Sequence, residues 1–183
     1  ETDTRKITPG TLFFALHGEH FDAHQFLNAE FVSHLTCAVV DPDRVPEGLG
    51  VFPRIHVSNP RVALGRLAQY YRTLFDIPVV GVTGSNGKTS TKECLASILR
   101  AQGQRALWSP ASFNNDVGIP LTLLEMDEGH EGAVIEIGTN HPGEIEHLCR
   151  MVRPTHGVIT SIGRSHLAFL GSEEGVVREK GFL

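Results

Sequence analysis

The fold of this chain is decided by one stretch, Val79-Val80-Gly81-Val82-Thr83-Gly84-Ser85-Asn86-Gly87-Lys88-Thr89-Ser90. A short apolar run ends there in a glycine-rich turn, and Gly-Lys-Thr then opens a run with helical spacing. This order is typical of a phosphate-binding loop, in which backbone N–H groups surround a polyphosphate, a lysine adds positive charge and a hydroxyl binds Mg²⁺. The strict motif has glycine at the position of Val82, so this loop is a variant. The residues expected to bind the phosphates are Gly84, Ser85, Asn86, Gly87, Lys88, Thr89 and Ser90.

Strand and helix patterns alternate on both sides of this loop. Apolar runs at 79–82, 133–137 and 157–160 read as buried strands, and the spacing over 88–101 and 144–151 predicts helices. Buried strands that alternate with helices predict an α/β fold with a mainly parallel sheet over residues 77–183.

Polar residues follow three of these predicted strands. Thr89 comes just after the first strand, Glu136 lies at the end of the second, and His166 follows the third. Ligands of parallel sheets bind at the carboxyl ends of the strands, so we expect these side chains to face one crevice. A hydroxyl, a carboxylate and an imidazole beside a triphosphate suit one or two Mg²⁺ ions.

Residues 1–76 predict a separate, smaller α/β domain. Strand patterns occur at 12–16, 38–40 and 55–57, a polar loop covers 18–24, and helices are expected over 25–33 and from about residue 60. Ile77-Pro78 marks the predicted boundary between the two domains.

Composition narrows the class of protein. The chain has 183 residues, 40% of them hydrophobic, and a net charge of −5, which argues against nucleic-acid binding and against a membrane-surface protein. No apolar run approaches the roughly 20 residues that span a bilayer, and no signal peptide is recognisable. Cys37, Cys94 and Cys149 fit no metal-binding spacing and cannot all pair, which favours a reducing cytoplasm.

Six blocks of the sequence resemble the Mur ligase family, the amide-forming enzymes of peptidoglycan precursor synthesis. The phosphate loop extends to Thr83-Gly84-Ser85-Asn86-Gly87-Lys88-Thr89-Ser90-Thr91-Lys92-Glu93 in the form found in that family. The other blocks lie in the same order as in the family, at residues 3–10, 18–24, 114–124, 136–145 and 162–167. The resemblance covers essentially the whole chain and is strongest to the member that joins D-alanyl-D-alanine to UDP-N-acetylmuramoyl-tripeptide.

The resemblance implies a division of work between the two domains. The N-terminal domain of such ligases binds the UDP part of the precursor, and the central domain binds MgATP. A precursor carboxylate takes the γ-phosphate to form an acyl phosphate, which the incoming amine then attacks. The positions that match the UDP contacts are Asp3, Thr4, Arg5, Gly18, Phe21, Asp22 and His24. The resemblance also places the reaction in the cytoplasm of a bacterium.

Roles at the ATP site carry over in the same way. Thr89 and Glu136 match ligands of a first magnesium, and His166 matches a ligand of a second. Lys180 matches a lysine that the family carbamylates and uses as a magnesium ligand. The remaining matches are Asn114 and Asn115 beside the γ-phosphate and the attacking carboxylate, and Asn140 and His141 on the substrate side. Catalytic roles are expected for Lys88, Asn115, His166 and Lys180.

Two positions and the length depart from the family pattern. Ala168 and Phe182 stand where the family usually has acids. Family ligases also have a longer central domain and a C-terminal domain that closes over ATP, so we expect this chain alone to be inactive. Alternative interpretations are a ligase similar to folylpolyglutamate synthase, a non-catalytic nucleotide-binding module, and a simple P-loop ATPase or kinase.

Overall fold

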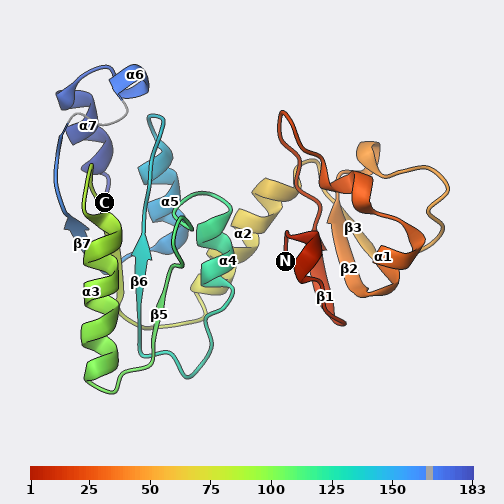
Figure 1. Ribbon diagram of the computed structural model, residues 1–183, viewed down its shortest axis with the longest axis horizontal. Helices are drawn as coiled ribbons and strands as arrows, with labels where there is room; N and C mark the ends of the chain where they lie inside the picture. Colours follow the sequence, from red (N-terminus) through yellow and green to blue (C-terminus); the bar gives the residue numbers. More distant parts are fainter. Residues whose placement is uncertain (164–166) are drawn as a thin grey trace. The chain divides into compact units, whose positions relative to one another are not determined.

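The computed structural model describes residues 1–163 and 167–183, and the chain divides into two compact units, Glu1–Leu64 and Gly65–Leu183 (Figure 1). Each unit has its own sheet, and every strand pair in both sheets is parallel. The predicted α/β class with parallel sheets is therefore confirmed. Within the described residues, no helix combines the length and the apolar character that crossing a membrane requires.

The first unit is built on a three-stranded sheet in the order β1-β2-β3. The strands are β1 (Thr11–Phe14), β2 (Leu35–Val40) and β3 (Arg54–His56). The 3₁₀ helix η1 (Thr4–Lys6) precedes β1, and short helical segments connect the strands, namely η2 (Ala23–Phe26), α1 (Ala29–Ser33) and η3 (Pro42–Arg44). Alternate residues of β1 and β2 share one core with the residues around η2 and α1; its buried members are Phe13, Ala15, Ala23, Leu27, Val32, Ala38, Val40 and Phe52.

The single helix expected over 25–33 is wrong, because the structure has two short segments there. The 3₁₀ helix η2 ends at Phe26, and α1 begins at Ala29. Between them, Asn28 has extended backbone angles, and its side-chain oxygen accepts a hydrogen bond from Phe31 N at 2.9 Å. Asparagine favours such a cap over a position inside a helix, because its side chain competes for the backbone N–H groups.

The second unit contains a four-stranded sheet in the order β5-β6-β4-β7. Its strands are β4 (Val79–Thr83), β5 (Ala106–Trp108), β6 (Gly132–Glu136) and β7 (His156–Ile159). The chain starts in the inner strand β4, moves outward to β5, returns to β6 beside β4, and then adds β7 on the other side of β4. Strand order thus reverses at β4, and the carboxyl ends of strands at such a reversal border the crevice where α/β sheets bind ligands.

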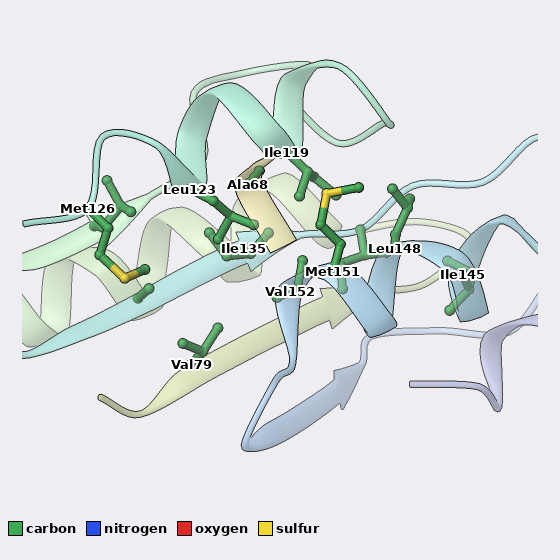
Figure 2. Packing of buried hydrophobic residues seen from close by; sticks show 13 residues of the cluster. Ala68, Val79, Ile119, Leu123, Met126, Ile135, Ile145, Leu148, Met151 and Val152 are labelled. Atoms are coloured by element: carbon green, nitrogen blue, oxygen red, sulfur yellow. The ribbon is translucent and has the colours of Figure 1, made fainter. Parts of the chain in front are cut away.

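Helices cover both faces of this sheet. Figure 1 shows α3 (Lys88–Ala101) on one face and α4 (Gly118–Leu123) and α5 (Glu144–Val152) on the other. The face covered by α4 and α5 also receives Ala68 of α2 (Pro60–Arg72) and forms the main core of the unit (Figure 2). Its buried residues are Ala68, Val79, Leu107, Ile119, Leu123, Met126, Ala133, Ile135, Ile137, Ile145, Leu148, Met151 and Val152.

Several elements of the second unit were not predicted. Beside the three-residue strand β5, these are α4 and the C-terminal helices α6 (Leu167–Leu170) and α7 (Glu173–Lys180). Proline disfavours the interior of a helix, yet Pro120 lies in the first turn of α4. Proline is compatible with a first turn, because the N–H group that it lacks would have no partner within the helix.

A buried arginine ties three segments of the second unit together. Arg72, at the end of α2, is only 6% exposed. Its guanidinium donates to Phe75 O at 2.6 Å and Ile77 O at 3.4 Å in the segment before β4. It also donates to Val152 O at 3.0 Å and to Arg153 O at 3.4 Å at the end of α5. Burial lowers the pKa of this group, but guanidinium groups stay charged in proteins, so Arg72 serves as a charged donor to four carbonyls.

We expect Arg72→Leu to destabilise the second unit by about 3 kcal/mol, because it leaves buried carbonyl groups without a donor. The measurement is urea unfolding followed by the fluorescence of Trp108, the single tryptophan, which lies in β5. Arg66→Leu, on the exposed side of the same helix, is the control. Equal unfolding midpoints for the two variants would contradict the role assigned to Arg72.

Candidate functional site

Two glycines shape the turn between β4 and α3. Gly84 has φ of +149°, and a Cβ atom there would lie 2.0 Å from Thr160 Oγ1. Gly87 has φ of +82° and caps α3, whose first turn receives no side-chain hydrogen bond at this cap within the described part of the chain. The first N–H groups of a helix point outward and carry partial positive charge. The start of α3 therefore offers donors to an anion.

The middle of the turn is attached to the segment that follows β7. Ser85 Oγ donates to Gly163 O at 3.1 Å and accepts from Gly163 N at 3.0 Å. Asn86 N donates to Ser161 Oγ at 2.9 Å, and Asn86 O accepts from Thr160 Oγ1 at 2.6 Å. These contacts hold the shape of the loop, so the side chain of Ser85 and the backbone of Asn86 are engaged within the protein.

Lys88 brings a positive charge to the same place. Its Nζ atom donates to Gly84 O at 2.8 Å, across the turn. Ser90 lies exposed in the first turn of α3. A lysine and the start of a helix both favour an anion, and here they lie at one turn.

The carboxylate of Glu136 is the centre of the polar contacts at this edge of the sheet. Glu136 ends β6, pairs with Val82 of β4, and is 3% exposed. Its Oε2 atom accepts from Thr89 Oγ1 at 2.8 Å, and its Oε1 atom accepts from Asn114 Nδ2 at 2.9 Å. Its backbone N–H donates to Ser109 Oγ at 2.8 Å. The structure thus brings Thr89, Glu136 and Asn114 together.

Glu136 is a buried carboxylate. Among the described residues it forms no ion pair, and its two side-chain donors are neutral. Buried carboxylates are normally paired with a cation. The carboxylate of Glu136 and the hydroxyl of Thr89 are oxygen ligands of the kind that Mg²⁺ takes together with phosphate oxygens and water, so this donor set fits the ion.

The structure gives less information on the predicted ligands of a second metal ion. No group of three or more His, Cys, Asp or Glu side chains that could hold a metal is gathered in residues 1–163 and 167–183. His166, the predicted ligand of a second magnesium, lies outside the described residues.

Asn115 differs from its neighbour Asn114 in what it contacts. Its Oδ1 atom accepts from Val117 N at 3.1 Å and from Gly118 N at 2.9 Å, at the start of α4. Because the amide oxygen is used in this way, the NH₂ group is the part of the side chain that has donors for a ligand.

Asn140 and His141 belong to a loop that a glutamate organises. Glu144 Oε2 accepts from Asn140 N at 2.6 Å and from His141 N at 3.0 Å. Partial burial acts to raise the pKa of Glu144, but these hydrogen bonds outweigh it and hold the pKa below its usual value. The His141 ring lies 3.2 Å from Glu144 Oε1 through Nδ1 and packs on Phe169 with 4.3 Å between ring centroids.

A second glutamate links this loop to α7. Glu179 is 3% exposed and accepts from Gly143 N at 2.7 Å and from Ile145 N at 2.8 Å, at the start of α5. The hydroxyl of Thr139 approaches the same carboxylate at 3.5 Å. Glu179 therefore holds α7, which carries Lys180, against the segment that follows β6.

Lys180 is buried, with 2% of its surface exposed. Burial is the main cause that lowers its pKa, repulsion from Lys88 lowers the pKa further, and Glu179 partly opposes both. The charge of Lys88 therefore acts on Lys180, although the two residues lie on different helices.

In the first unit, Asp3 and Arg5 form a two-pronged ion pair. Asp3 Oδ1 accepts from Arg5 Nε at 2.9 Å, and Asp3 Oδ2 accepts from Arg5 Nη2 at 2.7 Å. These hydrogen bonds hold the pKa of Asp3 well below its usual range. Asp3 also caps η1, whose first residue is Thr4. The guanidinium of Arg5 is solvent-exposed.

His24 is buried between two aspartates. Its Nε2 atom accepts from Asp41 N at 3.0 Å, so Nδ1 carries the proton and donates to Asp22 Oδ1 at 2.6 Å. Arg44 Nη1 donates to the other oxygen of Asp22 at 3.0 Å. Burial acts to raise the pKa of Asp22, but the hydrogen bonds from His24 and Arg44 lower it below its usual value. Both ring nitrogens of His24 are thus engaged within the fold.

Gly18 and Phe21 close the loop that His24 supports. Gly18 N donates to Phe21 O at 2.7 Å. The Phe21 side chain is exposed and lies beside Phe26, with 6.0 Å between the ring centroids. Within this loop Phe21 presents its side chain to solvent, whereas Asp22 and His24 determine the shape of the loop.

Sequence reasoning missed three residues that support the site. Ser109 holds the backbone of Glu136, Lys92 is fully buried with Nζ 2.7 Å from Ser109 O, and Glu179 caps α5. Lys92 belongs to the block of residues 83–93 that resembles the family loop, and it lies four residues after Lys88. This spacing on one helix was the signal in the sequence that could have placed Lys92 near Lys88. The sequence holds no comparable local signal for Ser109 or Glu179, because their partners are distant in the chain.

Comparison with known proteins identifies what this arrangement is similar to. Residues 82–183 match the family model described as Mur ligase middle domain. The chain is 43% identical over 183 residues to UDP-N-acetylmuramoyl-tripeptide–D-alanyl-D-alanine ligase of Haemophilus influenzae, covering 98% of this chain and 39% of that protein. It is 41% identical over 180 residues to the Escherichia coli ligase of the same name, covering 98% of this chain and 39% of the relative.

Solved structures give the same result. MurF from Acinetobacter baumannii superposes with a TM-score of 0.89 at 38% identity, covering 100% of this chain and 39% of that chain. MurF ligase from Thermotoga maritima, solved in complex with ADP, superposes with a TM-score of 0.87 at 30% identity, covering 100% of this chain and 42% of that chain. The chain thus spans about 39% of the length of the curated relatives that it matches. With more than half of its residues in the family model, the chain belongs to the Mur ligase family.

Proposed function

We propose that this chain forms the nucleotide-binding and precursor-binding part of an ATP-dependent ligase that adds D-alanyl-D-alanine to UDP-N-acetylmuramoyl-tripeptide. The observation that carries the proposal is the buried Glu136 carboxylate, which contacts Thr89 in the first turn of a helix whose start offers donors to an anion. The names of the relatives support the choice of substrates, and the ADP bound to the Thermotoga ligase supports the nucleotide.

The proposed reaction has two steps. A carboxylate oxygen of the tripeptide attacks the γ-phosphorus of ATP, the bond to the β-phosphate oxygen breaks, and an acyl phosphate and ADP result. The amine of D-alanyl-D-alanine then attacks the acyl carbon, loses a proton, and expels inorganic phosphate as the amide forms. Such chemistry depends on positioning and on neutralising charge more than on covalent help from the protein.

The described residues divide these tasks. The N–H groups at the start of α3 bind phosphate oxygens, and Lys88 exchanges its contact with Gly84 O for one with the nucleotide. Glu136 and Thr89 would hold Mg²⁺, which when bound would neutralise the charge of the phosphates. The NH₂ group of Asn115 donates to an anionic oxygen without adding charge.

The first unit receives the UDP part of the precursor in this proposal. Of the predicted precursor-binding domain, residues 1–76, residues 1–64 form the first unit, whereas residues 65–76 belong to the second unit together with the predicted first part of the ATP-binding domain, residues 77–183. Arg5 and Phe21 present exposed side chains, while Asp22 and His24 hold the shape of the loop. Asn140 and His141 lie on the substrate side of the second unit. ATP and a UDP-linked precursor place the reaction in the cytoplasm.

A thermal-shift panel tests both halves of the proposal. We expect UDP-N-acetylmuramoyl-tripeptide, UDP and MgATP to raise the melting temperature of the chain, while a folate does not. A ligand at 100 times its dissociation constant stabilises the state that binds it by about 2.7 kcal/mol. A shift with folate and none with the UDP compounds would contradict the choice of precursor, and no shift with MgATP would contradict the nucleotide site.

Lys88→Met tests the charge at the loop. We expect the dissociation constant for MgATP, measured by calorimetry, to rise at least tenfold, because a hydrogen bond to a charged group contributes about 1.5–3 kcal/mol. Lys6→Met removes the same charge from an exposed position and is expected to leave ATP binding unchanged. Equal affinities for the two variants would exclude Lys88 from the phosphate site.

We further propose that Lys180 is carbamylated. A lowered pKa leaves a larger share of Lys180 as the neutral amine at neutral pH. That amine attacks CO₂, an N–C bond forms, and a proton is released, so a buried cation becomes an anionic oxygen ligand. In this form Lys180 would supply carboxylate oxygens, the kind of ligand that Mg²⁺ takes.

The carbamate is detectable directly. With ¹³C-labelled bicarbonate, we expect the carbon NMR spectrum of the chain to show a carbamate resonance that is missing from Lys180→Arg. The arginine keeps a positive charge but does not form the adduct. Identical spectra for the parent and the variant would rule out the modification at Lys180.

A further inference from the structure

The side chain and backbone of Asn114 are held between two neighbours. Asn114 Nδ2 donates to Glu136 Oε1 at 2.9 Å, and Asn114 O accepts from Gly138 N at 2.8 Å. Gly138 faces the same amide closely, since a Cβ atom on Gly138 would lie 2.9 Å from Asn114 Cγ. The absence of a side chain at Gly138 therefore makes room for the amide that reaches Glu136.

The two oxygens of Glu136 have different partners. Oε1 takes the amide of Asn114, which comes from the loop after β5, and Oε2 takes the hydroxyl of Thr89, which comes from α3. Thr89 is itself a candidate metal ligand, whereas an amide NH₂ group has no lone pair to offer a cation. Asn114 thus fixes the orientation of the carboxylate by donating to Oε1. The other oxygen, Oε2, lies beside Thr89 and is the one that a cation would bind.

An amide suits this task better than a charged donor. A lysine or arginine at the position of Asn114 would cancel the charge of Glu136 and so compete with a metal ion. The amide supplies a hydrogen bond and no charge, so the carboxylate keeps its full attraction for a divalent cation.

We propose that Asn114 is a positioning residue that acts through Glu136, and that Gly138 is glycine because a side chain there would displace the Asn114 amide. This inference rests on the proposed function, because it concerns the site proposed for MgATP. It differs from the expectation that Asn114 contacts the γ-phosphate. A direct contact affects nucleotide binding with or without metal, whereas positioning of Glu136 affects only the dependence on metal.

Two variants separate these roles. Asn114→Ala removes the amide, and Gly138→Ala leaves every polar group in place but adds a methyl group where the amide now lies. Gly132→Ala is the matched control, because it lies on β6 and its added Cβ would meet only Pro78 O, at an ordinary 3.5 Å. Calorimetry with ATP is run on the whole chain, first in EDTA and then at increasing Mg²⁺ concentration.

ATP affinity should increase with Mg²⁺ concentration. For both variants we expect the Mg²⁺ concentration that gives half of this increase to be at least ten times higher than for the parent. Affinity in EDTA should stay within twofold of the parent for both, and Gly132→Ala should match the parent throughout. A loss of affinity in EDTA for Asn114→Ala would overturn the inference in favour of a direct nucleotide contact. An unchanged Mg²⁺ requirement in Asn114→Ala would overturn it even if Gly138→Ala did not fold. No ATP binding by the parent under any condition would overturn the proposed function together with this inference.

Discussion

The burial of one carboxylate is the constraint on which the rest of the proposed nucleotide site depends. Removing a charged group from water costs several kcal/mol, so Glu136 at the end of β6 requires partners for both oxygens. The fold meets this need with donors from separate segments, Thr89 from α3 and Asn114 from the loop after β5. Because both donors are neutral, the charge of Glu136 remains available for the cation that we propose to bind there.

The features that sequence predicted are those with a local or topological cause. Gly84 and Gly87 were placed in a phosphate-binding turn, and the structure gives both the positive φ angles that glycine tolerates. Thr89 and Glu136 were expected at one crevice because they follow strands of one parallel sheet, and their side chains meet at 2.8 Å. Periodicity sufficed for the α/β class, since buried strands and amphipathic helices each leave a regular pattern.

The features that sequence could not predict depend on contacts between distant segments. Nothing near Asn114 indicates that its amide reaches a carboxylate twenty-two positions later, and nothing near Glu179 indicates that it caps a helix starting at Glu144. The family resemblance placed His24 among the UDP contacts, whereas in the structure Asp22 and Asp41 engage both of its ring nitrogens. Side-chain chemistry limits what a residue can bind, but only the packing shows whether a partner within the protein already occupies it.

The carboxylate of Glu179 has a consequence for anions in solution. Two helices of the second unit, α3 and α5, begin after a left-handed glycine, Gly87 and Gly143. At α5 the protein inserts its own carboxylate against the first amide groups of the helix, while in the described residues no side chain caps the start of α3 at Gly87. Of these two helix starts, only that of α3 therefore has amide groups that free phosphate or sulfate would reach without displacing a carboxylate of the protein. If the start of α3 binds the phosphates of ATP as proposed, such ions should compete with the nucleotide there, whereas Glu179 already occupies the corresponding amide groups of α5.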